Sequence, residues 1–278
     1  MSGENSLHPR AFLAVKYRPS SPLMKLPILR LMSLTVCGLG CSLVATATAA
    51  EPAIVAKARS FLGSEAALNA VKSVHFVGTL VTSDPADPAK QTRAAVEIFF
   101  QTPEKQRIQA TSDKTIEVTA LDGYDAWQRV QDLANPANWQ LKLLGVEQIK
   151  RLRAGTWESL EFFRGIERHG GRVEDQGAAT MDGVACEKLA FIYAANIIFY
   201  RYFDQATGRL VYTETEAGGT QREQGETIVS GVRFPKTIIT ANKNSSGQTQ
   251  TITLNFEKVT VNEAMPDSLF AVPALPAK

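Results

Sequence analysis

Few residues of this 278-residue sequence have the types and spacing that catalysis or metal binding requires. His75 and His169 do not stand at the short spacings from other ligands that zinc sites use, and no Gly-x-Ser-x-Gly nucleophile motif is present. Cys186 lies in an apolar run, where we expect it to be buried as a small hydrophobic residue. The sequence therefore predicts no catalytic residue, no metal ligand and no cofactor, and we expect a protein that is not an enzyme.

The chemistry that the sequence does support is the exclusion of water from apolar surface. Ten apolar residues in the expected strands could line a cavity that holds an apolar guest, or they could form an ordinary packed core. The ten cavity candidates are Val96, Ile98, Phe100, Ile116, Val118, Phe191, Phe199, Ile252, Leu254 and Phe256. Both interpretations remain open at the level of the sequence.

The N-terminal region has the parts of a secretory signal peptide. Residues 24–30 form a short basic region, residues 31–44 form an apolar run, and residues 45–50 have small side chains. The apolar run is shorter than the ~20 residues that a membrane span needs, so we expect a signal peptide at 24–50 that is cleaved near Ala49 or Ala50. Residues 1–23 show no pattern, and we expect them to be disordered and to reflect an over-long start.

Export predicts a periplasmic protein. Lipidation of Cys41 is a less favoured alternative, because Gly38 occupies the position where a lipoprotein signal has an apolar residue. Of the 30 basic and 28 acidic residues, five and one lie in residues 1–50, which leaves 25 and 27 in the remainder. A slightly acidic mature chain gives no reason to expect nucleic-acid binding, which needs a concentrated basic face.

Hydrophobic periodicity predicts a mixed order of helices and strands. Residues 51–70 have helical spacing with a break at Gly63 and a cap at Ser64. Residues 143–166 have helical spacing with an interruption at Gly155. Alternating segments fill the rest, and they include the hairpin that ends with the strand Gln248–Phe256.

These elements predict one α+β domain over residues 51–278, because no Pro- or Ser-rich linker divides it. We expect about nine to eleven strands in one antiparallel order, with few helices to cover a long apolar face. A highly curved half-barrel closed by helices, with an apolar interior, satisfies that pattern. We expect a monomer in which Trp139 and Trp157 belong to the core.

Several short stretches resemble, in order, the outer-membrane lipoprotein carriers of the LolA/LolB type and related periplasmic lipid-binding proteins. They are residues 121–127, 181–189, 202–210, 231–235 and 261–270. The resemblance implies an incomplete antiparallel barrel closed by helices, with an interior for acyl chains and no catalytic residues. The best-known carriers also use an arginine near the cavity mouth. Arg93, Arg107 and Arg129 are unassigned candidates for it.

The sequence thus leads to two hypotheses. The first is an exported carrier that binds an acyl chain or a lipoprotein's lipid moiety and exchanges it with delivery proteins of the inner or outer membrane. The second is an envelope sensor or scaffold of the same fold that binds a protein partner.

Overall fold

The structure is a computed structural model that describes residues 51–87, 89–243 and 246–274. Glu51–Lys278 form one compact unit. The expected signal peptide, Cys41 and the expected over-long start lie outside the described residues. None of the helices in the described part of the chain has the length and apolar character needed to cross a bilayer.

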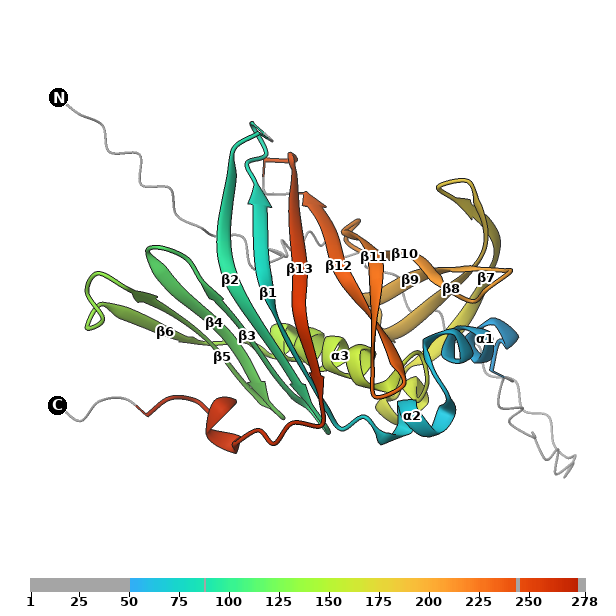
Figure 1. Ribbon diagram of the computed structural model, residues 1–278, viewed down its shortest axis with the longest axis horizontal. Coiled ribbons are helices and arrows are strands. Elements are labelled where there is room, and N and C mark those ends of the chain that lie inside the picture. Colours follow the sequence, from blue (N-terminus) through green and yellow to red (C-terminus); the bar gives the residue numbers. More distant parts are fainter. Residues whose placement is uncertain (1–50, 88, 244–245, 275–278) are drawn as a thin grey trace, which may run out of the picture. The chain divides into compact units, whose positions relative to one another are not determined.

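One antiparallel sheet of 13 strands dominates the molecule (Figure 1). The strands are β1 (Ser73–Ser83), β2 (Gln91–Gln101), β3 (Lys105–Thr111), β4 (Thr115–Asp122), β5 (Asp125–Asp132), β6 (Trp139–Leu143), β7 (Arg172–Met181), β8 (Val184–Ala194), β9 (Ile197–Asp204), β10 (Leu210–Thr215), β11 (Thr220–Val229), β12 (Val232–Lys243) and β13 (Thr249–Val261). Their order is β6-β5-β4-β3-β2-β1-β13-β12-β11-β10-β9-β8-β7, so the curved sheet is not closed. Two up-and-down runs of strands meet where β1 pairs with β13.

The helices are few. They are α1 (Ala53–Leu62), α2 (Glu65–Ala70), α3 (Val146–Glu161) and two short 3₁₀ turns, η1 (Ile166–His169) and η2 (Asp267–Leu269). The predicted break at Gly63 is confirmed, and Ser64 caps α2 by accepting a hydrogen bond from the Ala67 backbone N–H at 3.2 Å. The predicted interruption at Gly155 is wrong, because α3 runs through it. The Thr156 hydroxyl instead donates to the Leu152 carbonyl within the helix.

The half-barrel class is confirmed, but the expected strand count is too low. The expected strands do not include β6, because it is only five residues long and directly precedes the central helical stretch. The first half of β11 was missed because it is rich in polar residues and contains Gly225, which has a φ of +62°. The first half of β11 lacks the alternation on which strand prediction rests, and β6 alternates over five residues only.

The strand register separates the two faces of the sheet, because residues directly opposite each other in a ladder point to the same side. Phe76 pairs with Ile98 on β2 and Val259 on β13, and Leu80 pairs with Leu254. We call the side that holds these residues the inner face. Its opposite is the outer face.

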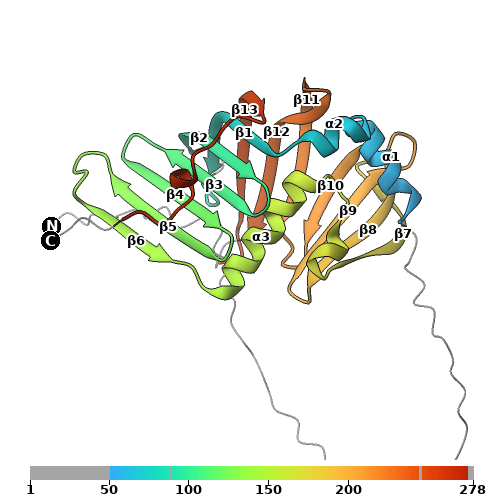
Figure 2. The same ribbon diagram turned by 90° about the horizontal axis from the view of Figure 1, so that it is seen from below.

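The helices pack on the inner face at two separate places (Figure 2). Near β4 and β5, Leu152 of α3 packs against Leu121 and Ala126. Near β8 and β9, Ile54 and Val55 of α1 pack with other buried apolar residues, among them Leu189, Phe191 and Phe203. The C-terminal half of α3 bridges toward β9 through Trp157, which contacts Ile197.

The outer face of β3–β5 is covered by the segment that follows β13. Phe270 in that segment is fully buried, and its carbonyl accepts a hydrogen bond from the indole Nε1 of Trp127 at 2.9 Å. Arg107 donates to the neighbouring Leu269 carbonyl at 3.0 Å. The C-terminal segment therefore supplies a small second core on the face that the helices leave uncovered.

Candidate functional site

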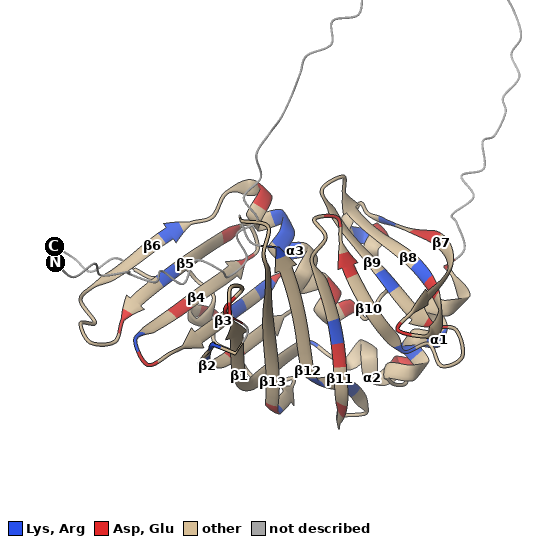
Figure 3. Ribbon diagram, turned by 90° about the horizontal axis from the view of Figure 1, so that it is seen from above, with Lys and Arg blue, Asp and Glu red and all other residues tan. Residues whose placement is uncertain are grey.

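The middle of the inner face is an apolar stripe that runs across β2, β1, β13 and β12. Val96 of β2 lies opposite Gly78, and Gly78 lies opposite Phe256 of β13. One step along, Leu80 lies opposite Leu254, which in turn lies opposite Ile238 of β12. Figure 3 shows that these central strands carry few charged residues along their length. We call this set of residues the apolar stripe.

Eight of the ten predicted cavity residues share the inner face. They are Val96, Ile98, Phe100, Phe191, Phe199, Ile252, Leu254 and Phe256. An aromatic cluster joins part of this set, because the ring of Phe76 lies 4.6 Å from that of Phe256 and 6.5 Å from that of Phe100. Phe234 of β12 completes the cluster at 5.8 Å from Phe76.

Ile116 and Val118 point to the outer face, so they are not part of the stripe. Val118 lies opposite Gln109, which lies opposite Glu97, and this row is one residue out of step with Val96 and Ile98. Val118 packs with Ala120 and Trp127 instead. Residues 115–120 alternate clearly, but their apolar side faces the C-terminal segment, which covers Trp127, and not the helices.

The part of the stripe on β13 is less buried than an ordinary core. Val96 and Ile98, near α3, are 1% and 6% exposed. Ile252, Leu254 and Phe256 on β13 are only half-buried, although they are large and apolar. Packing of the helices is concentrated on β2–β5 and on β8–β9, and the end of α1 also meets the start of β12, where Gly63 pairs with Val232. The centre of the inner face is therefore apolar surface that the described helices cover incompletely.

A buried ion pair lies on the same face, between α3 and β9. The guanidinium Nη2 of Arg201 pairs with Glu158, and the two side chains are 9% and 7% exposed. The hydroxyl of Tyr193 donates to the other oxygen of Glu158 at 2.5 Å. Burial, and then the charge of Glu158, raise the pKa of Tyr193 well above its usual range, so its phenol stays protonated as a donor.

Sequence reasoning missed Arg201, although a signal was present. In Ile197–Asp204 the alternate residues Phe199, Arg201 and Phe203 share one side, so a cation stands on the apolar side of a strand. Its guanidinium lies 4.8 Å from the ring of Phe163 and 5.0 Å from that of Phe191. Two of the predicted cavity residues, Phe191 and Phe199, therefore flank a charge.

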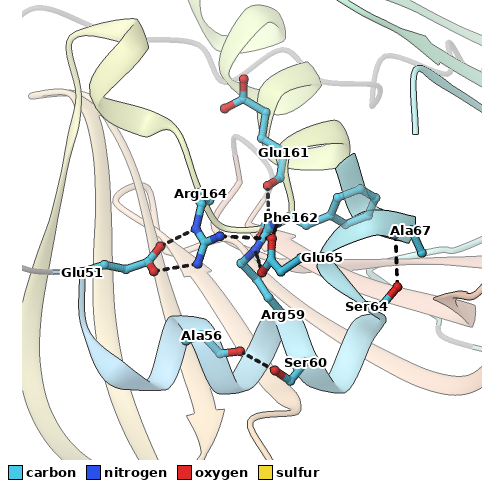
Figure 4. Close-up of polar contacts among 10 residues, drawn as sticks. All are labelled: Glu51, Ala56, Arg59, Ser60, Ser64, Glu65, Ala67, Glu161, Phe162 and Arg164. Carbon is cyan, nitrogen blue, oxygen red and sulfur yellow. Dashed lines mark hydrogen bonds and ion pairs between the residues drawn. The ribbon is translucent and has the colours of Figure 1, made fainter. Parts of the chain in front are cut away.

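A second arginine joins the helices to one another. Arg59 of α1 is 2% exposed and donates to the carbonyls of Glu161 and Phe162 at 2.9 and 2.8 Å (Figure 4). It also forms a two-point contact with Glu65 of α2 at 2.8 and 2.6 Å. Arg164 extends the group by bonding Glu65 and, twice, Glu51. One guanidinium thus fixes α1, α2 and the end of α3 together.

The three arginines that the sequence offered for the cavity mouth lie elsewhere. Arg93, Arg107 and Arg129 all occupy outer-face positions of their strands. Burial, and then repulsion from Arg129, lower the pKa of Arg107. All three therefore point away from the apolar stripe, whereas Arg59 and Arg201 lie on the side of the sheet where the helices pack.

The two histidines and the cysteine of the described residues make contacts typical of structural side chains. His75 lies between Glu97 and Glu263 at 3.3 and 3.1 Å, and His169 bonds Glu161 at 2.9 Å while it stacks on Trp157 at 3.7 Å. Cys186 is fully buried, as predicted, and burial raises the pKa of its thiol. Within the described ranges, no three His, Cys, Asp or Glu side chains gather as a metal site would require. Trp157 belongs to the core at 8% exposure, and Trp139 is half-buried on β6.

Comparison with known proteins yields matches in structure alone. No protein-family model matches the chain, and a search of curated proteins finds no match to its sequence. A LolA superfamily protein from Nitrosomonas europaea has a TM-score of 0.51 and 13% identity, over 79% of this chain and 96% of that one. A DUF1329 family protein from Desulfovibrio piger has a TM-score of 0.50 and 9% identity, over 79% and 96%.

The MucA/MucB complex of Pseudomonas aeruginosa also matches, at 10% identity over 76% of this chain and 99% of that one. Its TM-score of 0.22 is too low to carry an argument. At these low identities, the two matches with TM-scores of 0.50 and 0.51 show the fold and give no information on the ligand. This chain has the fold of the LolA superfamily.

Proposed function

We propose that this protein is an exported, non-enzymatic carrier that binds an acyl chain on its inner face. The observation that carries the proposal is the apolar stripe, where large side chains of β13 remain half-buried between two separate helix contacts. A soluble domain gains stability by burying such side chains, so their incomplete burial favours a surface that a guest covers.

The physical basis of binding would be the exclusion of water. Each methylene that leaves water contributes about 0.8 kcal/mol, so affinity should rise with the length of the acyl chain. Residues 249–256 and 237–242, which carry the stripe on β13 and β12, include no charged residue. An acyl chain bound there would therefore not have to displace the water around a charged side chain. A chain laid across these strands would replace solvent on Leu254 and Phe256.

The fold adds support from a different direction. The chain shares its fold with a LolA superfamily protein, and residues 24–50 have the composition of an export signal. We propose that the signal is removed, that residues 51–278 act in the periplasm, and that the cargo is a lipid or the acylated end of a lipoprotein. Membrane proteins of the envelope would supply and accept it.

The test uses the mature protein, expressed with its leader and purified without detergent. Mass spectrometry of an organic extract should show a lipid in stoichiometric amount, and fluorescent acyl probes should bind more tightly as the chain lengthens. Leu254→Asn should weaken probe binding by about tenfold, since it removes apolar contact from the stripe. The matched control is Ile228→Asn, at a residue that is 59% exposed at the end of β11. A lipid-free extract together with no probe uptake would contradict the proposal.

A protein-binding role is the alternative, and the open ends of the sheet favour it. β6 and β7 each pair with one neighbour only, so each has one edge whose backbone groups could pair with an added strand. The β-bulge near Gly177 in β7 interrupts that edge, which makes β6 the better candidate. Co-purification of one protein at fixed stoichiometry, with no lipid in the extract, would favour this role over the carrier.

A further inference from the structure

The buried guanidinium of Arg201 has donors that the described residues do not use. Its Nη2 pairs with Glu158, but its Nε and Nη1 have no hydrogen-bond partner within the described ranges. Both nitrogens are shielded from solvent. Buried N–H groups of a charged side chain are costly when unpaired, so the arrangement favours an acceptor supplied from outside the protein.

The position of Arg201 indicates which molecule could supply that acceptor. In the strand register Arg201 lies opposite Leu189 and Thr213, on the inner face that carries the apolar stripe. Three aromatic rings surround it, those of Phe163, Phe191 and Phe199, at 4.8 to 5.9 Å. A polar group that reaches these donors would therefore belong to a molecule that is otherwise apolar.

The charges around Arg201 favour a neutral hydrogen-bond acceptor over an anion. Glu158 already neutralises Arg201, and Glu223 lies on the same face within electrostatic reach of it. Burial raises the pKa of Glu223, and the charge of Arg201 opposes that rise. An added carboxylate or phosphate would be a further acidic group around one cation in a poorly solvated place. A carbonyl oxygen accepts two hydrogen bonds and brings no charge.

We propose that Arg201 binds the ester or amide carbonyl oxygen of an acylated ligand, with Glu158 and Tyr193 holding the guanidinium in place. The inference rests on the proposed carrier function and narrows it to ligands whose chains are joined through a carbonyl. Nε and Nη1 donate to the carbonyl while the chain lies along the apolar stripe. Free fatty acids and alkyl ethers of equal length are poorer ligands, the first because of charge and the second because they lack the carbonyl acceptor.

The experiment compares three ligands of the same chain length on the mature protein, by competition against a fluorescent acyl probe. They are a monoacylglycerol, the corresponding monoalkylglycerol ether and the free fatty acid. We expect the ester to bind about tenfold more tightly than the ether, the difference expected of a hydrogen bond to a charged donor. This comparison needs no variant, so it stands even if substitutions at the ion pair impair folding.

A paired substitution then assigns the preference to Arg201. Arg201→Met combined with Glu158→Gln removes both charges together, so no unpaired ion is left, and the introduced amide oxygen would still accept a hydrogen bond from Tyr193. We expect the ester-to-ether ratio to fall to about one while the affinity for the ether is unchanged. The matched control is Arg151→Met with Glu216→Gln, a partly exposed ion pair beside the start of β9, which should leave the ratio unchanged.

The outcomes are distinct. Equal binding of ester and ether by the unaltered protein would overturn the assignment of Arg201 while leaving the carrier function intact. Tighter binding of the fatty acid than of the ester would replace it with an anion site. Failure of all three ligands and of the probe to bind would contradict the carrier function, and the inference with it.

Discussion

The guanidinium of Arg59 and the backbone carbonyl of Phe162 are 2.8 Å apart, across 103 residues of sequence. Phe162 ends α3 with a φ of +51°, a left-handed conformation that few residues other than glycine adopt. Its carbonyl is one of those that a helix end leaves without an internal partner. Arg59 supplies the missing donor, so α1 takes part in ending α3.

Arg59→Met should therefore destabilise the domain by about 3 kcal/mol. It leaves the Glu161 and Phe162 carbonyls without their donor and frees Glu65, whereas methionine can still fill the apolar part of the site. Chemical denaturation would measure the change. Arg164→Met is the control, because Arg164 is 40% exposed and its ion pairs should contribute less than about 1 kcal/mol. Equal losses in the two variants would show that Arg59 has no special role.

The contact between Arg59 and Glu65 should make the stability of the domain depend on pH. The hydrogen bond from Arg59 is the largest cause that lowers the pKa of Glu65 in the folded protein. A depressed pKa stabilises the fold above the unfolded value of about 4.3, and that contribution is lost as the pH falls through the folded value. The Tm of the unaltered protein should exceed that of Glu65→Gln at pH 7, and the gap should close below about pH 4. A gap that widened on acidification would contradict this pairing.

Gly155→Ala should stabilise the protein by up to about 1 kcal/mol. Gly155 lies inside α3 with ordinary helical geometry, and a Cβ there would meet no atom within 4 Å. Alanine lowers the conformational entropy of the unfolded chain and has the higher helix propensity. A rise of Tm in thermal denaturation would check it, whereas a fall would indicate that the helix needs flexibility at this point.

Gly78→Ala should have the opposite effect. A Cβ at Gly78 would lie 2.0 Å from the backbone oxygen of Asn255, and a backbone atom in a paired strand cannot move aside cheaply. We expect a loss of about 3 kcal/mol in denaturant, since relief requires β1 and β13 to separate locally at their bulge. Gly155→Ala, where the Cβ meets open space, is the control, and it should not lower stability.

Periodicity was sufficient to predict the fold class, because it identifies strands one at a time and most strands here alternate clearly. It could not decide which side of each strand faces the helices. Val96 and Val118 look alike in sequence, yet the ladder from β2 through β3 to β4 puts them on opposite faces. That relation depends on register, which is set by turns and bulges far from either residue.

The polar part of the site was harder to predict, since its residues come together only in the folded chain. Glu158 lies in a helical stretch that also carries other charged residues, but its carboxylate is buried against Arg201, 43 positions away in sequence. Arg201 was recognisable only as a cation on the apolar side of a strand. Arg59 gave no signal in the sequence, because an arginine in the last turn of a helix is common on protein surfaces.

The meeting of β1 and β13 has a consequence for how the domain responds to force. Among the described strands it is the one pairing between elements that are not neighbours in sequence, and it joins two runs that could each form from local hairpins. Val74 near the start of β1 lies opposite Val261 at the end of β13, so both chain ends leave from the same end of this ladder. Tension on the two ends would therefore break the hydrogen bonds between β1 and β13 one pair at a time. It would separate the two runs of strands before either run unfolded.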